Sequence, residues 1–222
     1  MKQFNWSNYA ANSLSGDWSP AKLIPNPEEV THYDSLLAEA FYRAAANEAD
    51  ACTIYQVASD FATSDAWSYY SALWLRDEIR HSEAFYRMGC YLQPKPENTW
   101  HECFKYRDRQ LYMQIFHSEL HVWAALALDE WNTHQEYLQL AKQVEPLGLK
   151  DLVLAIAADE ARHYSYAVYA LKAVDYQQAS AVLSEMAAIA QLGYPDEQFL
   201  FDHDRPNHQK ALEITKRYLQ LS

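Results

Sequence analysis

The sequence predicts an all-α fold, an antiparallel four-helix bundle with two additional helices at its C-terminal end. Only four of the 222 residues are glycine and half are hydrophobic, so turns are few and regular elements are long. Apolar residues recur at the three- and four-residue spacing of amphipathic helices along four long segments. Short or proline-marked breaks separate these segments, which favours antiparallel packing of neighbouring helices.

The length favours a single domain, residues 1–222, with three parts. Residues 1–25 mix polar residues with two tryptophans without any period, and we expect an extended arm that lies on the body of the protein. Residues 26–173 contain the four long amphipathic segments, and residues 174–222 contain the two C-terminal helices.

The first helix is predicted to begin at "NPEE" (26–29) and to end near residue 60. Asn26 suits the N-cap, Pro27 the first helical position, and Glu29 closes a capping box. Ser64 with Asp65 forms the next cap, and the second helix ends before the prolines of "QPKPEN" (93–98).

The third helix is predicted from the capping box of Thr99 and Glu102 to about residue 143, with a possible kink. "EPLG" (145–148) breaks it, and the fourth helix follows to about residue 173. The two C-terminal helices are expected at about 176–192 and 206–221, joined by a loop.

Composition excludes several classes of function. With 30 acidic and 18 basic residues the formal charge is -12, which repels nucleic acid, and no basic patch offsets it. No apolar run reaches the length of a membrane span or a signal peptide. The three cysteines form no C-x-x-C pair and no disulfide framework, so we expect a cytoplasmic protein.

A polar five-residue motif occurs twice within otherwise apolar helix patterns. "RDEIRHSEAF" (76–85) and "ADEARHYSYA" (158–167) share the core D-E-x-R-H, at 77–81 and 159–163. Glu48 precedes Glu78 by 30 residues, and Glu130 precedes Glu160 by 30 residues. The unit therefore repeats with an offset of 82 residues, as expected for two copies of one helical hairpin.

Each pair of glutamates is placed to meet across its hairpin. Residues on the two arms lie at the same depth when the turn falls at their midpoint, which is 63 for the first pair and 145 for the second. Both midpoints coincide with predicted breaks. Glu119 is a second choice for Glu130, because it shares the same helix face three turns earlier, although its midpoint with Glu160 falls within the predicted helix.

These spacings predict a site for two metal ions. A Glu and a His at i and i+3 project from the same side of a helix, so each motif can supply both to one ion. Four buried carboxylates alone would be too costly, whereas two divalent cations neutralise them. The predicted ligands and catalytic residues are Glu48, Glu78, His81, Glu130, Glu160 and His163.

The pattern Glu, Glu-x-x-His, Glu, Glu-x-x-His over residues 37–171 resembles the ferritin-like carboxylate-bridged di-iron proteins. The doubled D-E-x-R-H form is most similar to their oxygen-activating branch, which includes bacterial multicomponent monooxygenases, the ribonucleotide reductase small subunit, acyl-carrier desaturases and arylamine N-oxygenases. The resemblance implies that Glu78 and Glu160 bridge or chelate two irons, or one manganese and one iron. It also implies that Glu48 and Glu130 are terminal ligands, each bound to one ion only.

The resemblance also implies a role for the other motif residues. Asp77 and Asp159 would accept a hydrogen bond from the histidine of the opposite hairpin, and Arg80 and Arg162 would pair with these aspartates. His134, four residues after Glu130, is a possible extra ligand such as some N-oxygenases possess, although their additional histidine belongs to the fourth helix. A histidine that faces outward is the simpler interpretation.

The activity implied by the resemblance is that of an oxygenase or oxidase, which uses dioxygen to hydroxylate, N-oxygenate or desaturate a small organic substrate. A ferredoxin or flavin reductase would supply electrons, and family habit favours a homodimer. The residues expected to line the substrate pocket are Ala44, Cys52, Ser71, Trp74, Phe85 and Ala127.

Two other functions stay open. The first is iron oxidation and storage or peroxide removal, as in ferritins and rubrerythrins, although the C-x-x-C module usual in rubrerythrins is missing. The second is radical generation, as in the ribonucleotide reductase small subunit, whose radical tyrosine follows the first motif's glutamate by seven residues. Phe85 occupies that position here, with Tyr86 beside it.

Overall fold

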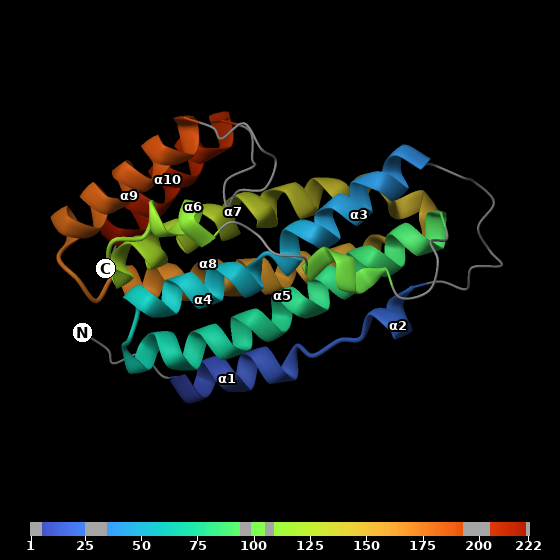
Figure 1. Cartoon of the computed structure of the whole chain (residues 1–222), viewed down its shortest axis with the longest axis horizontal. Coiled ribbons are helices and arrows are strands. Elements are labelled where there is room, and N and C mark those ends of the chain that lie inside the picture. Colours follow the sequence, from blue (N-terminus) through green and yellow to red (C-terminus); the bar gives the residue numbers. More distant parts are fainter. Residues whose placement is uncertain (1–5, 25–34, 94–98, 105–108, 193–204, 221–222) are drawn as a thin grey trace.

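The structure, a computed structural model, describes residues 6–24, 35–93, 99–104, 109–192 and 205–220. Within these ranges every regular element is a helix, so the predicted all-α class is confirmed. The long elements are α3 (Ser35–Ala49), α5 (Asp65–Leu92), α7 (Glu119–Gln143) and α8 (Lys150–Leu171). α3 packs along α5 and α7 packs along α8, which gives two helical hairpins that face each other (Figure 1).

The first predicted helix is divided in two. α3 ends at Ala49, and α4 (Ala51–Phe61) continues from it in the same general direction (Figure 1). At Asp50 the backbone tightens, because its N–H bonds to Asn47 O three residues back and Thr53 N bonds to Asp50 O. The predicted cap at Asn26, Pro27 and Glu29 lies outside the described residues.

α5 begins where the sequence predicts. Ser64 has an extended backbone, and its side chain accepts a hydrogen bond of 3.1 Å from the N–H of Trp67. This satisfies one of the amide groups that the first turn of a helix leaves without a partner.

The predicted start of the third helix at Thr99 is wrong. The chain forms a 3-10 helix (η2, Trp100–Phe104) and a short helix (α6, Arg109–Met113) before α7 begins at Glu119. Ile115 and Phe116 are buried between α6 and α7 without being helical, and Ser118 is extended. Apolar spacing over so short a segment does not distinguish a buried connection from a helix.

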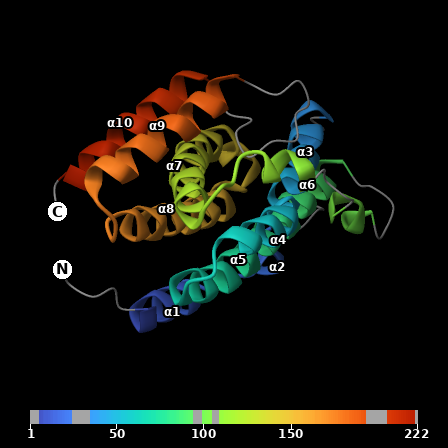
Figure 2. The ribbon, with the colours of Figure 1, turned by 60° about the vertical axis from the view of Figure 1, so that its left-hand side comes forward.

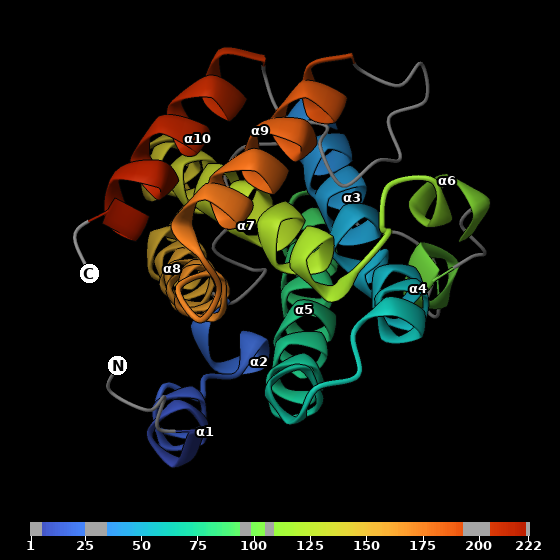
Figure 3. The same ribbon diagram turned by 90° about the vertical axis from the view of Figure 1, so that its left-hand side faces the viewer.

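The remaining boundaries agree with the sequence analysis. α7 ends at Gln143, and the break at "EPLG" is a 3-10 turn (η3, Glu145–Leu147) followed by Gly148 with a left-handed φ of 72°. α9 (Tyr176–Leu192) and α10 (Arg205–Gln220) are the two C-terminal helices. They form a further layer over α7 and α8 (Figures 2 and 3).

The N-terminal arm is helical rather than extended, which corrects the sequence prediction. α1 (Trp6–Ser15) and α2 (Pro20–Leu23) lie along α5, on the side of the molecule away from α9 and α10 (Figure 3). The Ser13 side chain is fully buried, and the Ser13 carbonyl accepts a hydrogen bond of 3.3 Å from Arg76 on α5. Packing against α5 stabilises helices that such a short, Asn- and Ser-rich sequence does not favour by itself.

Two apolar clusters occupy the two ends of the bundle. One includes Trp67, Tyr70, Trp74, Trp123 and Ala127, and the other includes Phe41, Phe85, Met88, Leu152 and Ile156. Among the described helices, none combines the length and the apolar character needed to cross a bilayer.

Candidate metal centre

The six predicted ligands meet in a polar layer between the two apolar clusters. On α5, Glu78 and His81 lie between Trp74 of one cluster and Phe85 of the other. On α8, Glu160 and His163 lie between Ile156 and Ala167 in the same way. Glu48 of α3 and Glu130 of α7 complete the layer, and all six side chains are buried.

The layer divides into two groups, each able to hold a metal ion. Glu48, Glu78, His81 and Glu160 form the first group; Glu78, Glu130, Glu160 and His163 form the second. Within each group, potential ligand atoms all lie within 4.8 Å of one another. Glu78 and Glu160 belong to both groups, so the two ions would be neighbours.

The His81 group is arranged around Nδ1 of the imidazole. This nitrogen lies 2.9 Å from Oε1 of Glu160 and 3.4 Å from Oε2 of Glu78. Oε2 of Glu48 is farther away, at 3.7 Å. Neighbouring ligands of an octahedral ion with bonds of about 2.1 Å stand about 3 Å apart, so two of these three distances suit a shared cation.

The His163 group repeats this arrangement, and it uses the second carboxylate oxygen of Glu78 and of Glu160. Nδ1 of His163 lies 3.1 Å from Oε1 of Glu78, 3.1 Å from Oε2 of Glu160 and 3.3 Å from Oε2 of Glu130. Glu78 and Glu160 therefore each direct one oxygen towards each histidine. The imidazole centroids are 6.0 Å apart.

The opposite nitrogen of each imidazole faces an aspartate of the other hairpin. Nε2 of His81 lies 3.1 Å from Oδ2 of Asp159, and Nε2 of His163 lies 3.4 Å from Oδ2 of Asp77. A proton on Nε2 that is donated to these carboxylates leaves the lone pair on Nδ1, directed towards the glutamates. The crosswise pairing inferred from the family resemblance is present in the structure.

The two motif arginines join the aspartates. Arg80 lies 2.9 Å from Asp77 and 2.7 Å from Asp159, and Arg162 lies 2.8 Å from Asp77 and 2.7 Å from Asp159. Asp17, which follows α1, also pairs with Arg80. This network of alternating charges connects the hairpins and fixes the positions of the aspartates.

The two terminal glutamates have different hydrogen-bond donors. Nε1 of Trp74 donates to Oε1 of Glu130 at 2.8 Å, whereas the phenol of Tyr137 donates to Oε1 of Glu48. Ile156 occupies the position equivalent to Trp74 in the second repeat and cannot donate. The repeat is therefore approximate, and each terminal carboxylate is oriented by a different residue.

In the metal-free layer the terminal and the shared glutamates differ: burial raises the pKa of Glu78 and Glu160, but the two histidines outweigh it, so both pKa values lie below the ordinary one. Burial raises the pKa of Glu48, with Glu78 adding to the increase, and burial also raises the pKa of Glu130 above its ordinary value. Burial lowers the pKa of His81 and His163, but surrounding carboxylates outweigh it, so both pKa values lie above the ordinary one. Without a metal, the layer therefore retains protons.

The aspartates behave in the opposite way. Burial raises the pKa of Asp77, but His163, Arg76 and Arg80 outweigh it, so the net pKa lies below its usual range. Asp159 shows the same direction, because His81 and Arg162 overcome its burial. Both aspartates are therefore anionic hydrogen-bond acceptors.

Three buried atoms show that the layer suits a cation. Nδ1 of His81, Oε1 of Glu78 and Oε1 of Glu160 make no hydrogen bond with any described part of the chain. Each nevertheless lies 2.9–3.1 Å from another potential ligand atom, because the atoms converge on common centres. Two divalent ions would supply the missing partners and neutralise the four carboxylates.

Glu119 is not part of the centre. Its carboxylate accepts hydrogen bonds of 3.2 Å from the backbone N–H groups of both Thr63 and Ser64, and it also bonds the Ser64 hydroxyl and the Trp123 indole. Glu119 thus connects the start of α7 to the start of α5. This structural contact explains why Glu119, on the same helix face as Glu130, is an acidic residue although it does not reach the metal centre.

His134 belongs to neither ligand group. Its Nδ1 lies 2.7 Å from the carbonyl oxygen of Ala157 on α8, so it donates a hydrogen bond across the hairpin. The outward-facing interpretation of His134 is the one that the structure supports.

The predicted pocket residues have varied surroundings. Ser71 and Ala127 are buried, whereas Ala44 and Cys52 are half-buried. Phe85 packs between Phe41 and Tyr137, with ring centroids 6.1 and 5.0 Å away. A substrate cavity at these residues stays a prediction.

Sequence reasoning missed one residue and left the role of another undefined. Trp18 donates from Nε1 to Oδ2 of Asp159 at 2.9 Å, and its ring stacks on His81 at 6.0 Å, but no pattern in the arm indicates this. Tyr137 carried a signal in the repeat, since it follows Glu130 by seven residues just as Tyr55 follows Glu48. Tyr55, at the equivalent position after Glu48, instead stacks on Trp67 at 6.5 Å.

Comparisons of the chain with protein-family models, with curated proteins and with solved structures find no match. The interpretation of this centre therefore rests on its own geometry.

Proposed function

We propose that this protein is a ferritin-like di-iron oxygenase or oxidase that uses dioxygen to oxidise a small organic molecule. One observation carries the proposal: Glu78 and Glu160 each direct one oxygen to the His81 group and the other to the His163 group. Carboxylates shared in this way would hold two ions side by side. Two adjacent iron(II) ions would supply the electrons that reduce dioxygen and the Lewis acidity that orients it.

The protein's own residues prepare the ligands. Asp77 and Asp159 hold the Nε2 protons of the histidines, so both Nδ1 atoms are lone-pair donors. Arg80 and Arg162 neutralise these aspartates and keep them in place. The histidines are thereby oriented before a metal binds.

The terminal carboxylates are also held in position. Trp74 fixes Glu130 and Tyr137 fixes Glu48 through single hydrogen bonds. Phe85 and Ile156 belong to the apolar cluster on one side of the layer, and Trp74 belongs to the cluster on the other. These side chains restrict the access of water to the layer, which strengthens the electrostatic interactions within it.

Anaerobic reconstitution with iron(II) tests the proposal. We expect about two irons per chain by elemental analysis, followed by dioxygen consumption and a transient visible absorption when air is admitted. Glu160→Ala should lose both the metal and the dioxygen uptake, whereas Glu145→Ala, a change at an exposed glutamate, should retain both. Reconstituted protein without bound metal, or uptake unchanged by Glu160→Ala, would contradict the proposal.

The same preparation distinguishes an oxygenase from an iron-storage protein. A storage protein would take up iron far beyond two ions per chain and would assemble into a large shell. We propose instead a small assembly, a homodimer, that receives electrons from a ferredoxin or flavin reductase. Light scattering and the iron-to-protein ratio separate the two functions.

A specific contact supports a second candidate, the generation of a tyrosyl radical. Phe85 occupies the sequence position of the radical tyrosine, but Tyr137 of the other hairpin lies beside it, with ring centroids 5.0 Å apart, and its phenol bonds to Glu48. A radical on Tyr137 would give an electron paramagnetic resonance signal after exposure to air. Tyr137→Phe should remove that signal and leave the metal content unchanged.

A further inference from the structure

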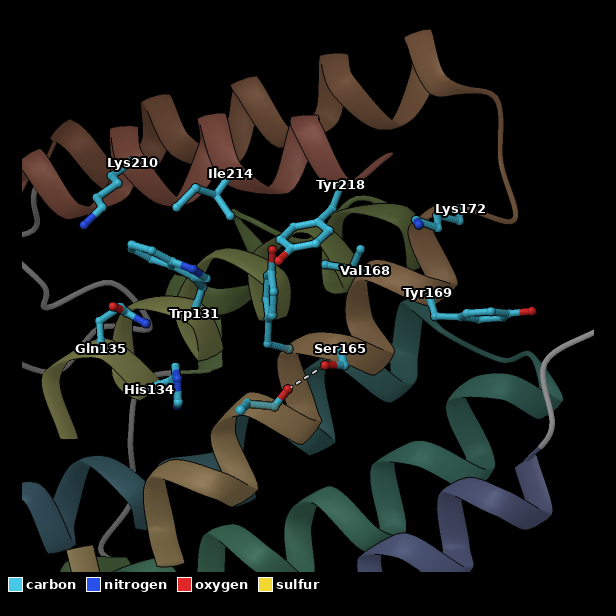
Figure 4. A pocket seen from close by; sticks show the side chains of 12 residues that line it. Trp131, His134, Gln135, Ser165, Val168, Tyr169, Lys172, Lys210, Ile214 and Tyr218 are labelled. Carbon is cyan, nitrogen blue, oxygen red and sulfur yellow. Dashed lines mark hydrogen bonds between the residues drawn. The ribbon is translucent and has the colours of Figure 1, made fainter. Parts of the chain in front are cut away.

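A hollow lies on the outer side of the α7–α8 hairpin, under α10 (Figure 4). Its volume is about 620 Å³, which is within the range of small-molecule sites. Trp131, His134 and Gln135 of α7 line one end, and α10 contributes Lys210, Ile214 and Tyr218. The rest of the lining comes from α8 and its C-cap, Lys172.

The hollow is separate from the metal centre. On α8 it is lined by Ala161, Tyr164, Ser165, Val168 and Tyr169, and Lys172 follows at the C-cap. At about 100° per residue, most of these positions lie on a different side of α8 from Glu160 and His163, which face the metal layer, and Tyr164, one turn after Glu160, lies between the two sides. Most of a ligand in the hollow would therefore be separated from the ions by the helix itself.

The lining combines aromatic rings with positive charge. Trp131, Tyr164, Tyr169 and Tyr218 contribute rings, and Tyr164 and Tyr218 meet edge to face with centroids 6.4 Å apart. Nζ of Lys210 lies 5.5 Å from the centroid of the Trp131 ring. Such a surface favours a flat, apolar ligand body.

Charge selects the sign of the ligand. The lining includes Lys172 and Lys210 but no aspartate or glutamate, in a chain whose formal charge is -12. Lys210 is exposed and Lys172 is half-buried, and the contact of Lys210 with the Trp131 ring leaves its charge without a carboxylate partner among the lining residues. Two such cations, in different parts of one aromatic hollow, favour a carboxylate over a neutral or positive group.

We propose that this hollow is a second binding site, which takes a small organic anion with a planar apolar body. The anionic group would lie near Lys172 or Lys210, and the body would lie against Trp131, Tyr164 and Tyr218. Binding there does not require the metal ions, so the inference stands apart from the proposed oxidation chemistry.

Ligand-observed NMR with 2-naphthoate and the uncharged 2-naphthamide tests the proposal on the full chain. Because small ligands gain little free energy per atom, we expect a Kd for 2-naphthoate on the order of 0.1–1 mM, and binding of 2-naphthamide about tenfold weaker. Both values should be the same with and without bound Mn(II).

Variants locate the probe. Lys172→Gln and Lys210→Gln should each weaken 2-naphthoate binding by about threefold to tenfold, and the double variant should bind the two probes equally. Ser165→Trp should fill the hollow and abolish the binding of both probes. Lys142→Gln, a matched change at an exposed lysine of α7, should have no effect. Since Lys172 also follows α8, where a cation stabilises the helix, the melting temperature of each variant is measured in parallel.

Three results would overturn the inference. The first is that the wild-type protein binds both probes equally or binds neither. The second is that the double variant retains the preference for 2-naphthoate. The third is that binding is lost on metal removal and is unaffected by Ser165→Trp, which would place the probe at the metal centre.

Discussion

The indole N–H of Trp18 donates a hydrogen bond of 2.9 Å to Oδ2 of Asp159, a residue 141 positions later in the chain. The same oxygen lies 3.1 Å from Nε2 of His81 and 2.7 Å from Arg80. The arginine also lies over the Trp18 ring, with Cζ 4.6 Å from the centroid. The N-terminal arm thus contributes directly to the position of a candidate metal ligand.

Replacing Trp18 should weaken the metal centre selectively. Trp18→Phe retains the ring but removes the hydrogen bond to Asp159, which then holds His81 less firmly. We expect the affinity for the ion in the His81 group to fall by about tenfold, because residues that orient a ligand typically contribute that much. Competition of Mn(II) with a chelating dye measures this change.

The control for this variant is Trp100→Phe, which removes an indole hydrogen bond of 3.0 Å to Ser82 instead. Its metal affinity should match that of the wild-type protein. Equal affinities in Trp18→Phe and Trp100→Phe would mean that the arm does not act through Asp159.

Shared and terminal glutamates should differ in metal stoichiometry. Glu78 directs an oxygen to each histidine, so Glu78→Ala should lose both ions; Glu48 belongs only to the His81 group, so Glu48→Ala should retain about one ion per chain. Anaerobic titration with Co(II), followed by absorption, counts the ions. Identical stoichiometries in the two variants would contradict the sharing of Glu78.

The same variants check that the fold survives. The pKa of Glu48 is raised by burial, so this side chain is protonated in the metal-free protein, and Glu48→Ala should leave the melting temperature nearly unchanged. Burial also raises the pKa of Glu78, but His163 and His81 outweigh it, so Glu78 is ionised and Glu78→Ala should lower the melting temperature by leaving a buried imidazolium without this partner. A large decrease in Glu48→Ala would indicate that this carboxylate stabilises the fold itself.

The part of the centre that the sequence predicts depends only on helical spacing. The 30-residue separations of Glu48 from Glu78 and of Glu130 from Glu160 place these side chains at equal depth in any hairpin with a turn at the midpoint. Because this relation is local to each hairpin, it could be found before any packing was known. The boundaries of α5 and α8 followed from Ser64 and from the break at residues 145–148 in the same way.

The residues that sequence analysis missed depend on tertiary packing. No periodic pattern connects Trp18 to Asp159, since their contact exists only because α1 and α2 lie along α5. Glu119 shares a helix face with Glu130, and only the position of the α5 N-terminus shows that it binds Thr63 and Ser64 instead. Spacing identifies a shared face, but not the neighbour that occupies it.

Glu119 is therefore expected to affect stability rather than metal binding. Its carboxylate accepts hydrogen bonds from two backbone amides at the start of α5, where a negative charge is also favoured by the helix dipole. Glu119→Ala should lower the free energy of unfolding by about 1–2 kcal/mol and the melting temperature by about 3–6 °C. Elemental analysis should still find both ions. If Glu119→Ala lost metal while its stability stayed unchanged, Glu119 would again be a candidate ligand.

Metal binding should release protons, because the metal-free layer holds them. The pKa values of His81, His163, Glu48 and Glu130 are all raised above their ordinary values, whereas a bound ion requires neutral imidazoles and ionised carboxylates. A group with a raised pKa stays protonated to higher pH, so the affinity for Mn(II) should decrease as the pH falls from 8 to 6. Calorimetric titrations in two buffers that differ in protonation enthalpy should give between about one and four protons released per chain. An equal binding enthalpy in both buffers would contradict this prediction. It would mean that the two histidines and the two terminal glutamates carry no extra protons in the metal-free protein.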